Sequence, residues 1–288
     1  MRNCHVRLAA LLLIACPAWV SPVLAEDVQQ VVEPPRIDKR FIAVEGGRNF
    51  RDAGGYATAD GRVVRRDVLY RSGSLGSLSL NGQQTVSGLG VTSIIDLRTV
   101  EERHQDMSNW LSVAGLGYWS RDYSMSMGDM RSLFSDPANL TRDGVHGMMT
   151  EAYRRLPFEQ APAYRELFTR LEQGKGPVVV NCTAGKDRTG VATALVLTAL
   201  GVPYDTVRQD FLLSNGAPGM DTLAGSSASP LAGLPPEVLA PLSGVDGGYL
   251  DAAFAAITAK HGGVPEYLEA ELGVGPKELA TLRKRMLE

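Results

Sequence analysis

The sequence contains few cysteines, few histidines and no long run of basic residues. It has three cysteines and four histidines among 288 residues, and His104, His146 and His261 share no metal-ligand spacing. We therefore expect no metal site and no other cofactor. The formal charge is −3, from 29 basic and 32 acidic residues, which provides no broad basic surface for nucleic acid.

The apolar run near the N-terminus, residues 8–15, is too short to span a bilayer. It follows two arginines and precedes a small-residue cleavage site that ends at Ala25. This arrangement is typical of a signal peptide. We expect residues 1–25 to be removed, which would give a periplasmic or secreted protein without an integral membrane span. As an alternative, a lipoprotein-type box ending at Cys16 would anchor the chain by acylation of that cysteine.

The rest of the chain is predicted to be globular, because 44% of all residues are hydrophobic and 21% are charged. Residues 26–40 are polar and contain a Pro-Pro pair, as expected of a flexible tether. Residues 215–248 are rich in Gly, Pro, Ala and Ser, and we interpret this stretch as a lid or insert whose residues 216–248 contribute to the wall of the substrate pocket. Strands are predicted at 68–71, 93–97, 118–123 and 178–180, and helices at 163–173, 189–200, 249–260 and 276–287. This order indicates an α/β fold.

The chemically distinctive segment is residues 178–190, VVVNCTAGKDRTG. Cleavage after Ala25 would leave Cys182 as the only cysteine, at the end of a buried strand. The loop after it can curl around an anion, because its peptide N–H groups and the following helix N-terminus favour negative charge. The same environment favours a thiolate. A structurally buried, unreactive cysteine is the alternative, but such cysteines seldom lie among Lys, Asp and Arg.

Two further side chains of this segment suit phosphate chemistry. The planar guanidinium of Arg188 can hold two phosphoryl oxygens at once. The hydroxyl of Thr189 can donate to the cysteine sulfur and stabilise it as a leaving group. The sequence thus predicts a phosphate-binding loop with a nucleophilic thiol.

The loop resembles the HCxxGKDRTG signature of bacterial tyrosine phosphatases of the dual-specificity-like type. Further segments resemble other blocks of that family in the same order: NFRDAGGY at 49–56, LYRSG at 69–73, IDLR at 95–98, DFLLSN at 210–215, and the segment 261–273. The resemblance implies one catalytic domain over residues 41–288. It also implies a central, mainly parallel sheet of the cysteine-phosphatase type, flanked by helices and carrying a helical lid or insert.

The resemblance implies a role for each loop residue. Cys182 matches the nucleophile, Arg188 the phosphate clamp, and Asp187 the acid that protonates the leaving oxygen. The backbone of the loop matches the phosphate cradle, formed by Thr183, Ala184, Gly185, Lys186 and the residues up to Arg188. Lys186 also matches a lysine thought to bind additional anionic charge, including that of phosphoinositides. Asn181 stands where the family usually has His, so we expect altered efficiency rather than loss of activity.

Several acidic residues outside the loop are candidates for supporting roles. Asp122, which comes after residues 118–121 of a predicted strand, is the alternative general acid. Asp52 and Asp96 are predicted to orient Arg51, Arg98 or Arg188. Arg51 itself is a candidate for direct contact with a substrate anion.

These observations predict a cysteine-dependent phosphomonoesterase that acts through a cysteinyl phosphate. The expected partner is a phosphorylated protein, on tyrosine or on serine and threonine, or a phosphoinositide. Two other classes stay open. One is a pseudophosphatase that binds phosphate esters without turnover, and the other is a thiol enzyme resembling rhodaneses or arsenate reductases.

Overall fold

The computed structural model describes residues 1, 38–108, 110–113, 116–124, 140–223 and 235–288. The predicted signal peptide and nearly all of the predicted tether lie outside the described residues, as do residues 224–234 of the predicted lid. Among the helices in the described ranges, none combines the length and the hydrophobicity that a membrane crossing requires.

The fold is built on a five-stranded sheet with the order β1-β2-β5-β3-β4. Its strands are β1 (Arg51–Asp52), β2 (Leu69–Ser72), β3 (Ser93–Asp96), β4 (Gly117–Ser120) and β5 (Val178–Asn181). Strands β2, β5, β3 and β4 are parallel, and only β1 runs antiparallel to its neighbour. The four predicted strands are confirmed, although β4 ends three residues before the predicted boundary. The two-residue strand β1 is too short to show a sequence period and was not predicted.

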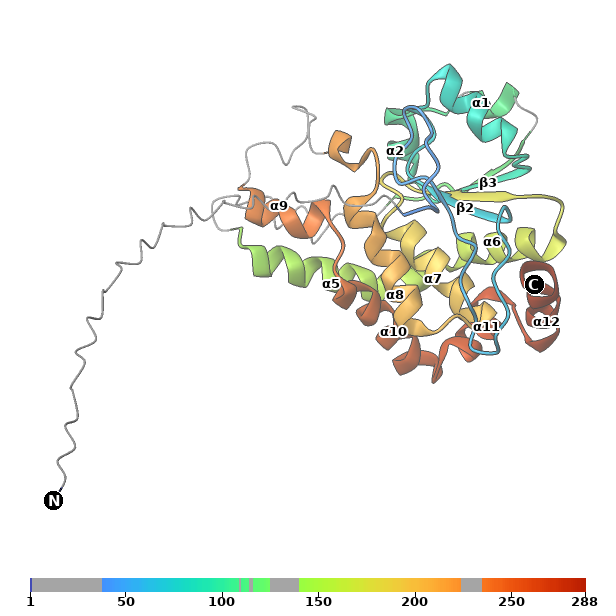
Figure 1. Ribbon diagram of the computed structural model, residues 1–288. Coiled ribbons are helices and arrows are strands. Elements are labelled where there is room, and N and C mark those ends of the chain that lie inside the picture. Colours follow the sequence, from blue (N-terminus) through green and yellow to red (C-terminus); the bar gives the residue numbers. More distant parts are fainter. Residues whose placement is uncertain (2–37, 109, 114–115, 125–139, 224–234) are drawn as a thin grey trace. The chain divides into compact units, whose positions relative to one another are not determined.

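Alternating side chains of the three inner strands divide the core into two clusters. Leu69, Ile95 and Val180 belong to the larger cluster, and Tyr70, Ile94 and Val179 belong to the smaller one on the other face. Helices α1 and α2 lie on one side of the sheet in Figure 1, and α5 to α8 with α10 to α12 lie on the other. The sheet is therefore covered on both faces, as a parallel sheet requires.

The helices confirm an α/β fold. Their bounds are α1 (Leu80–Gly88), α2 (Val100–Gln105), α3 (Trp110–Val113), α5 (Arg142–Glu159), α6 (Ala161–Gln173), α7 (Arg188–Leu200), α8 (Tyr204–Leu212), α9 (Pro236–Ser243), α10 (Gly247–His261), α11 (Val264–Leu272) and α12 (Pro276–Met286), with short 3₁₀ turns η2 (Leu213–Gly216) and η3 (Met220–Leu223). The predicted helices at 163–173, 189–200, 249–260 and 276–287 correspond to α6, α7, α10 and α12.

Six helices, α1, α2, α3, α5, α8 and α11, were not predicted individually. Three helices close the chain rather than two, because Gly262 ends α10 in the left-handed conformation, at φ 88°, and α11 starts anew with Pro265 in its first turn. Helix α5 was missed because Gly147 and Pro157 interrupt its pattern. Within the predicted lid the structure describes α9, which packs on α5.

The topology places one loop at the centre of the sheet edge. Strands β2, β5 and β3 are adjacent and parallel, so their carboxyl ends meet at this edge. The loop that follows β5 runs directly into α7 and contains Cys182. Sites of parallel α/β sheets lie at this edge.

Candidate active site

The loop between β5 and α7 has the properties of an anion cradle. Cys182 is a free thiol, buried to 1% exposure at the end of β5. The backbone N–H groups of residues 183–188 donate to no acceptor within the described part of the chain. Buried amides normally find a partner, so this series of free donors beside a helix N-terminus is suited to a phosphate group.

Gly185 lets this loop lie against the end of β2. Its φ is 70°, and a Cβ there would come within 2.4 Å of the Gly73 nitrogen. Its carbonyl accepts hydrogen bonds from Asn49 Nδ2 at 2.9 Å and from Arg71 Nη2 at 3.0 Å. These bonds fix the loop through its carbonyl and leave its amide donors available.

A buried ion cluster supports these contacts. The carboxylate of Asp210, on α8, accepts from Arg71 Nη1 at 2.7 Å, from Arg51 Nε at 3.2 Å and from the Tyr56 hydroxyl at 2.8 Å. Burial raises the pKa of Asp210, but the two guanidinium groups outweigh it and hold that pKa well below its usual range. Arg51 also donates to the Asn49 side chain, which in turn donates to Gly185.

This placement assigns Arg51 a supporting position. Its side chain has no exposed surface, and its guanidinium is engaged by Asp210 and Asn49. In this structure it therefore lies behind the loop and does not present itself to a substrate anion. Asp52 makes no side-chain hydrogen bond to Arg51, Arg98 or Arg188 in the described ranges, so its predicted role is not formed. Its carboxylate accepts instead from the amides of Gly54 and Asp67 and lies 3.8 Å from Arg66 Nη1.

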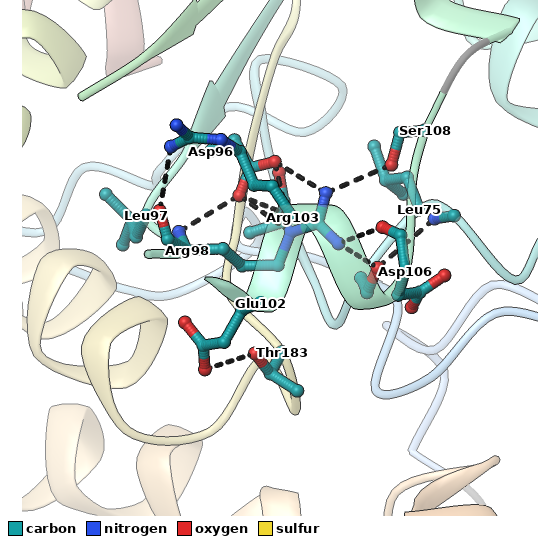
Figure 2. Close-up of polar contacts among 12 residues, drawn as sticks. Leu75, Asp96, Leu97, Arg98, Glu102, Arg103, Asp106, Ser108 and Thr183 are labelled. Carbon is teal, nitrogen blue, oxygen red and sulfur yellow. Dashed lines mark hydrogen bonds and ion pairs between the residues drawn. The ribbon is translucent and has the colours of Figure 1, made fainter. Parts of the chain in front are cut away.

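Arg188, the first residue of α7, is held by a carboxylate that the sequence analysis did not single out. Glu102 Oε2 accepts from Nη1 and Glu102 Oε1 accepts from Nη2, each at 2.6 Å. The same Glu102 Oε1 accepts from the Thr183 hydroxyl at 2.6 Å, as Figure 2 shows. Burial alone would raise the pKa of Glu102, but the hydrogen bonds and the positive charge of Arg188 outweigh burial and lower that pKa to about 2. Glu102 is therefore a carboxylate at neutral pH.

These contacts leave part of the guanidinium open. Nη1 also donates to the Leu97 carbonyl and to the Tyr123 hydroxyl. Nη2 has only a long second contact, 3.5 Å to the Thr183 hydroxyl. Nε donates to no group of the described chain. The Nε–Nη2 edge of Arg188 is therefore available for two phosphoryl oxygens.

Asp187 is the acidic side chain of the loop itself. It occupies the N-cap position of α7 yet makes no side-chain capping bond. Its Oδ1 accepts instead from the Tyr153 hydroxyl at 2.6 Å and from Lys186 Nζ at 2.8 Å. Lys186 is 5% exposed and also donates to the Gly244 carbonyl at 3.1 Å. Its ammonium group is thus bound within the protein, where it joins the loop to the segment between α9 and α10.

The alternative acid lies in a different setting. The Asp122 side chain is 88% exposed and pairs with Arg103 on α2. Its neighbour Tyr123 reaches Arg188, with 3.2 Å between the Tyr123 hydroxyl and Nη1. Asp187 therefore lies in the loop itself. Asp122 lies on the surface, next in sequence to Tyr123, which contacts Arg188.

Asn181 and Asp96 lie side by side at the ends of β5 and β3. Asn181 Nδ2 donates to Asp96 Oδ1 at 3.2 Å, while Asn181 Oδ1 is buried without a partner among the described residues. Asp96 binds both Nε and Nη2 of Arg98, as predicted for one of its three candidate arginines (Figure 2). Asp96 therefore orients Arg98 rather than Arg188.

The remaining loop residues are buried. Ala184 is 9% exposed. The hydroxyl of Thr189 is buried and has no partner among the described residues, the Cys182 sulfur included. The predicted donation from Thr189 to the sulfur is therefore not formed in this structure.

The sequence analysis missed several residues that support the site, among them Glu102, Tyr153 and Asp210. The pattern Thr99-x-x-Glu102 is a capping-box signature, and the structure forms that box. The signature indicates a helix start, however, and gives no sign that the same carboxylate reaches Arg188. Tyr153 and Asp210 are brought to the loop only by the packing of α5 and α8.

The comparisons with known proteins agree with this geometry. The model of the tyrosine phosphatase family matches residues 42–288. A chain of Cupriavidus necator that bears the name of a tyrosine-protein phosphatase is 34% identical over 245 residues, which cover 83% of this chain and 86% of that one. A tyrosine-protein phosphatase of Nostoc commune is 27% identical, with 99% of each chain covered.

A third relative is the triple specificity protein phosphatase PtpB of Mycobacterium tuberculosis. It is 32% identical over 199 residues, which cover 59% of this chain and 67% of that protein. The family match extends over nearly the whole described fold, including the loop and the helices that support it. The chain is a cysteine-dependent phosphatase, and it belongs to the tyrosine phosphatase family.

Proposed function

We propose that the loop after β5 hydrolyses phosphate monoesters, with Cys182 as nucleophile, Arg188 as clamp and Asp187 as acid and base. The observation that carries this assignment is the convergence of three features at one sheet edge. These are a free thiol, the series of unpaired amides at 183–188, and a guanidinium with an open Nε–Nη2 edge. Such fixed donors stabilise the charge of a transferring phosphoryl group.

The reaction proceeds in two displacements. The Cys182 thiolate attacks phosphorus, the S–P bond forms, and the ester P–O bond breaks while Asp187 gives its proton to the departing oxygen. Water then attacks the cysteinyl phosphate, Asp187 takes a proton from that water, and the S–P bond breaks to release inorganic phosphate and the thiolate. The proton count of Asp187 is restored after each turnover.

For the substrate we propose phosphotyrosine in a protein, with phosphoserine, phosphothreonine and phosphoinositides as the competing classes. The names of the three relatives support a protein substrate, and the name of the mycobacterial relative refers to three specificities. Rates on a phosphotyrosine peptide, a phosphoserine peptide and a phosphoinositide, measured side by side as kcat/KM, rank the classes directly. A phosphoinositide preference would contradict the proposal.

The mechanism is tested by hydrolysis of p-nitrophenyl phosphate in the presence of a chelator. We expect activity in the unmodified protein and loss of about four orders of magnitude or more in Cys182→Ser, because the weaker oxygen nucleophile is not ionised at neutral pH. Phosphate should still bind to that variant, since the amides and Arg188 remain. Full activity in Cys182→Ser would refute the thiolate mechanism.

The two alternative classes are not favoured. The relatives are named as phosphatases rather than as sulfur-transfer or arsenate enzymes. The residues of a catalytic loop are also intact, with Cys182, Asp187 and Arg188 all at the same sheet edge, so a binding protein without turnover has no supporting feature.

We also propose that the chain is exported, which rests on residues 1–25 of the sequence alone. N-terminal sequencing of the chain from a periplasmic fraction tests this proposal. A start at residue 26 supports cleavage after Ala25, whereas an acylated start at Cys16 supports the lipoprotein alternative. An intact N-terminus in the cytoplasm would contradict both.

A further inference from the structure

One buried hydroxyl contacts the proposed acid from outside the loop. Tyr153, on α5, has no exposed surface, and its hydroxyl lies 2.6 Å from Asp187 Oδ1. Lys186 Nζ donates to the same oxygen at 2.8 Å. Asp187 Oδ2 has no hydrogen-bond partner in the described ranges. One carboxylate oxygen is thus held by two donors while the other is left for a ligand.

The tyrosine ring is itself held in place. It stacks on Tyr249 of α10, with 5.1 Å between ring centroids, and meets Phe211 of α8 edge-on at 5.9 Å. Aromatic contacts of this kind, in a fully buried side chain, restrict rotation of the ring. The hydroxyl therefore has a defined position relative to the loop.

We infer that Tyr153 is a positioning residue for Asp187, fixing Oδ1 so that Oδ2 serves the leaving-group oxygen. The inference rests on the proposed function, in which Asp187 protonates that oxygen.

The surroundings of Asp187 are consistent with this role. The titratable and charged groups around it are Lys186, Cys182 and Arg188 from the loop, Tyr153 from α5, and Tyr249 from α10, beyond which lie Arg142, His146 and Asp246. Burial and the nearby Asp187 raise the pKa of Tyr153 well above its usual value. The Tyr153 hydroxyl therefore stays protonated, and remains a donor, over the working pH range.

The test compares Tyr153→Phe with Tyr267→Phe. The first variant removes the oxygen and keeps the ring contacts. The second removes an equally buried hydroxyl whose partner is the Pro157 carbonyl at 2.6 Å rather than Asp187. Urea unfolding of both variants shows that the fold is retained. His146→Gln controls for the loss of a ring that contacts Tyr249 and makes no hydrogen bond to Asp187 in the described ranges.

The readout is the dependence of kcat on the leaving group. In Tyr153→Phe we expect kcat to fall at least tenfold more on phenyl phosphate than on p-nitrophenyl phosphate, whose better leaving group needs less protonation. A misplaced acid lowers the rate most where the departing oxygen depends on its proton. Tyr267→Phe and His146→Gln should match the unmodified protein on both substrates.

The results that would overturn this inference differ from the result that would refute the proposed function. If Tyr153→Phe folds and keeps the original leaving-group dependence, the inference is overturned. It is also overturned if Asp187→Asn keeps the leaving-group dependence of the unmodified protein, a result that would point to Asp122 as the acid. Failure of the proposed function is recognised separately, by activity that survives Cys182→Ser.

Discussion

At Arg188 one guanidinium serves two anions, a permanent carboxylate and a transient phosphate. Glu102 occupies Nη1 and Nη2 and leaves the Nε–Nη2 edge open. A flexible arginine loses side-chain conformational freedom when it binds a ligand. The bidentate contact to Glu102 already restricts the Arg188 side chain before any ligand binds. Glu102 also holds the Thr183 hydroxyl, so a single carboxylate orders the clamp and one side of the loop.

Replacement of Glu102 by Gln should therefore weaken catalysis without abolishing it. The amide keeps the shape but cannot accept two charge-assisted bonds from Arg188, each worth about 1.5–3 kcal/mol. We expect kcat/KM on p-nitrophenyl phosphate to fall by about 10- to 100-fold. Glu101→Gln is the matched control, because the exposed Glu101 carboxylate accepts from the Ser124 hydroxyl and makes no hydrogen bond to Arg188 among the described residues. Equal activity in both variants would show that Arg188 needs no support from α2.

The same carboxylate makes stability depend on acid pH. Arg188 lowers the pKa of Glu102 to about 2, against an ordinary value of 4.5. A depressed pKa contributes stability that is complete above about pH 4.5 and is lost as the pH falls towards 2. The contribution is on the order of 3 kcal/mol. Urea unfolding at several pH values should show the stability gap between the unmodified protein and Glu102→Gln shrinking across this window, whereas a constant gap would contradict the shift.

Asp210 has a structural task at the same site. It is the carboxylate partner of two fully buried arginines, Arg51 and Arg71. Asp210→Asn leaves both positive charges without compensation, and removing one partner from a buried ion pair costs about 3–5 kcal/mol. We expect a loss of that size in the free energy of unfolding in urea. Asp205→Asn, at an exposed position on the same helix, should cost less than about 1 kcal/mol.

The residues that the sequence could reveal are those whose chemistry is local. Cys182, Asp187 and Arg188 lie within one short segment between a strand and a helix, so their spacing alone predicts a shared loop. Glu102 and Tyr153 reach the same loop from α2 and α5. No local pattern indicates those contacts, because they depend on how distant helices pack on the sheet.

Among the elements, the loop after β5 depends on a backbone conformation that favours glycine. Gly185 has φ 70°, and an added Cβ would lie within 2.5 Å of backbone atoms of Ser72 and Gly73. Gly185→Ala must therefore displace the loop from β2. We expect kcat/KM to fall by at least about 100-fold, because displaced amides no longer converge on phosphate. An active Gly185→Ala variant would show that the loop tolerates the shift.

A glycine elsewhere provides the contrast. Gly147 lies inside α5, and a Cβ there would meet nothing within 4 Å. Gly147→Ala should leave activity unchanged and should raise the free energy of unfolding by about 0.5–1 kcal/mol, since alanine favours the helix. Comparing Gly185→Ala with Gly147→Ala separates the effect of a Cβ that clashes with neighbouring backbone from the general effect of replacing a glycine.

The helices and strands that the sequence predicted are those with a clear periodic pattern of apolar residues. The buried strands around residues 94 and 179 and the amphipathic α6 have clear apolar patterns, and each was predicted near its observed bounds. Helix α5 carries its buried residues at irregular intervals, at 145, 153, 156 and 157. Its position is fixed by packing against α9 and α10, which no local signal reports.

Across the whole molecule, the loop is supported from both faces of the sheet. Helix α2 supplies Glu102 from one face, and α5 and α8 supply Tyr153 and Asp210 from the other. A ligand in the cradle therefore binds groups that are held in place from both layers. Because a ligand that binds only the folded state stabilises that state as a whole, phosphate should raise the unfolding temperature of the compact unit Ile37–Glu288.

The size of this rise follows from binding linkage. At a phosphate concentration about 100 times its Kd, the gain is about 2.7 kcal/mol, which for a unit of this length corresponds to roughly 5–10 °C in Tm. Cys182→Ser should show a comparable rise, because the amides and the clamp remain, whereas Arg188→Met should lose most of it. The measurement is a thermal melt with phosphate against chloride at equal ionic strength. A full rise in Arg188→Met would place the bound phosphate outside the loop.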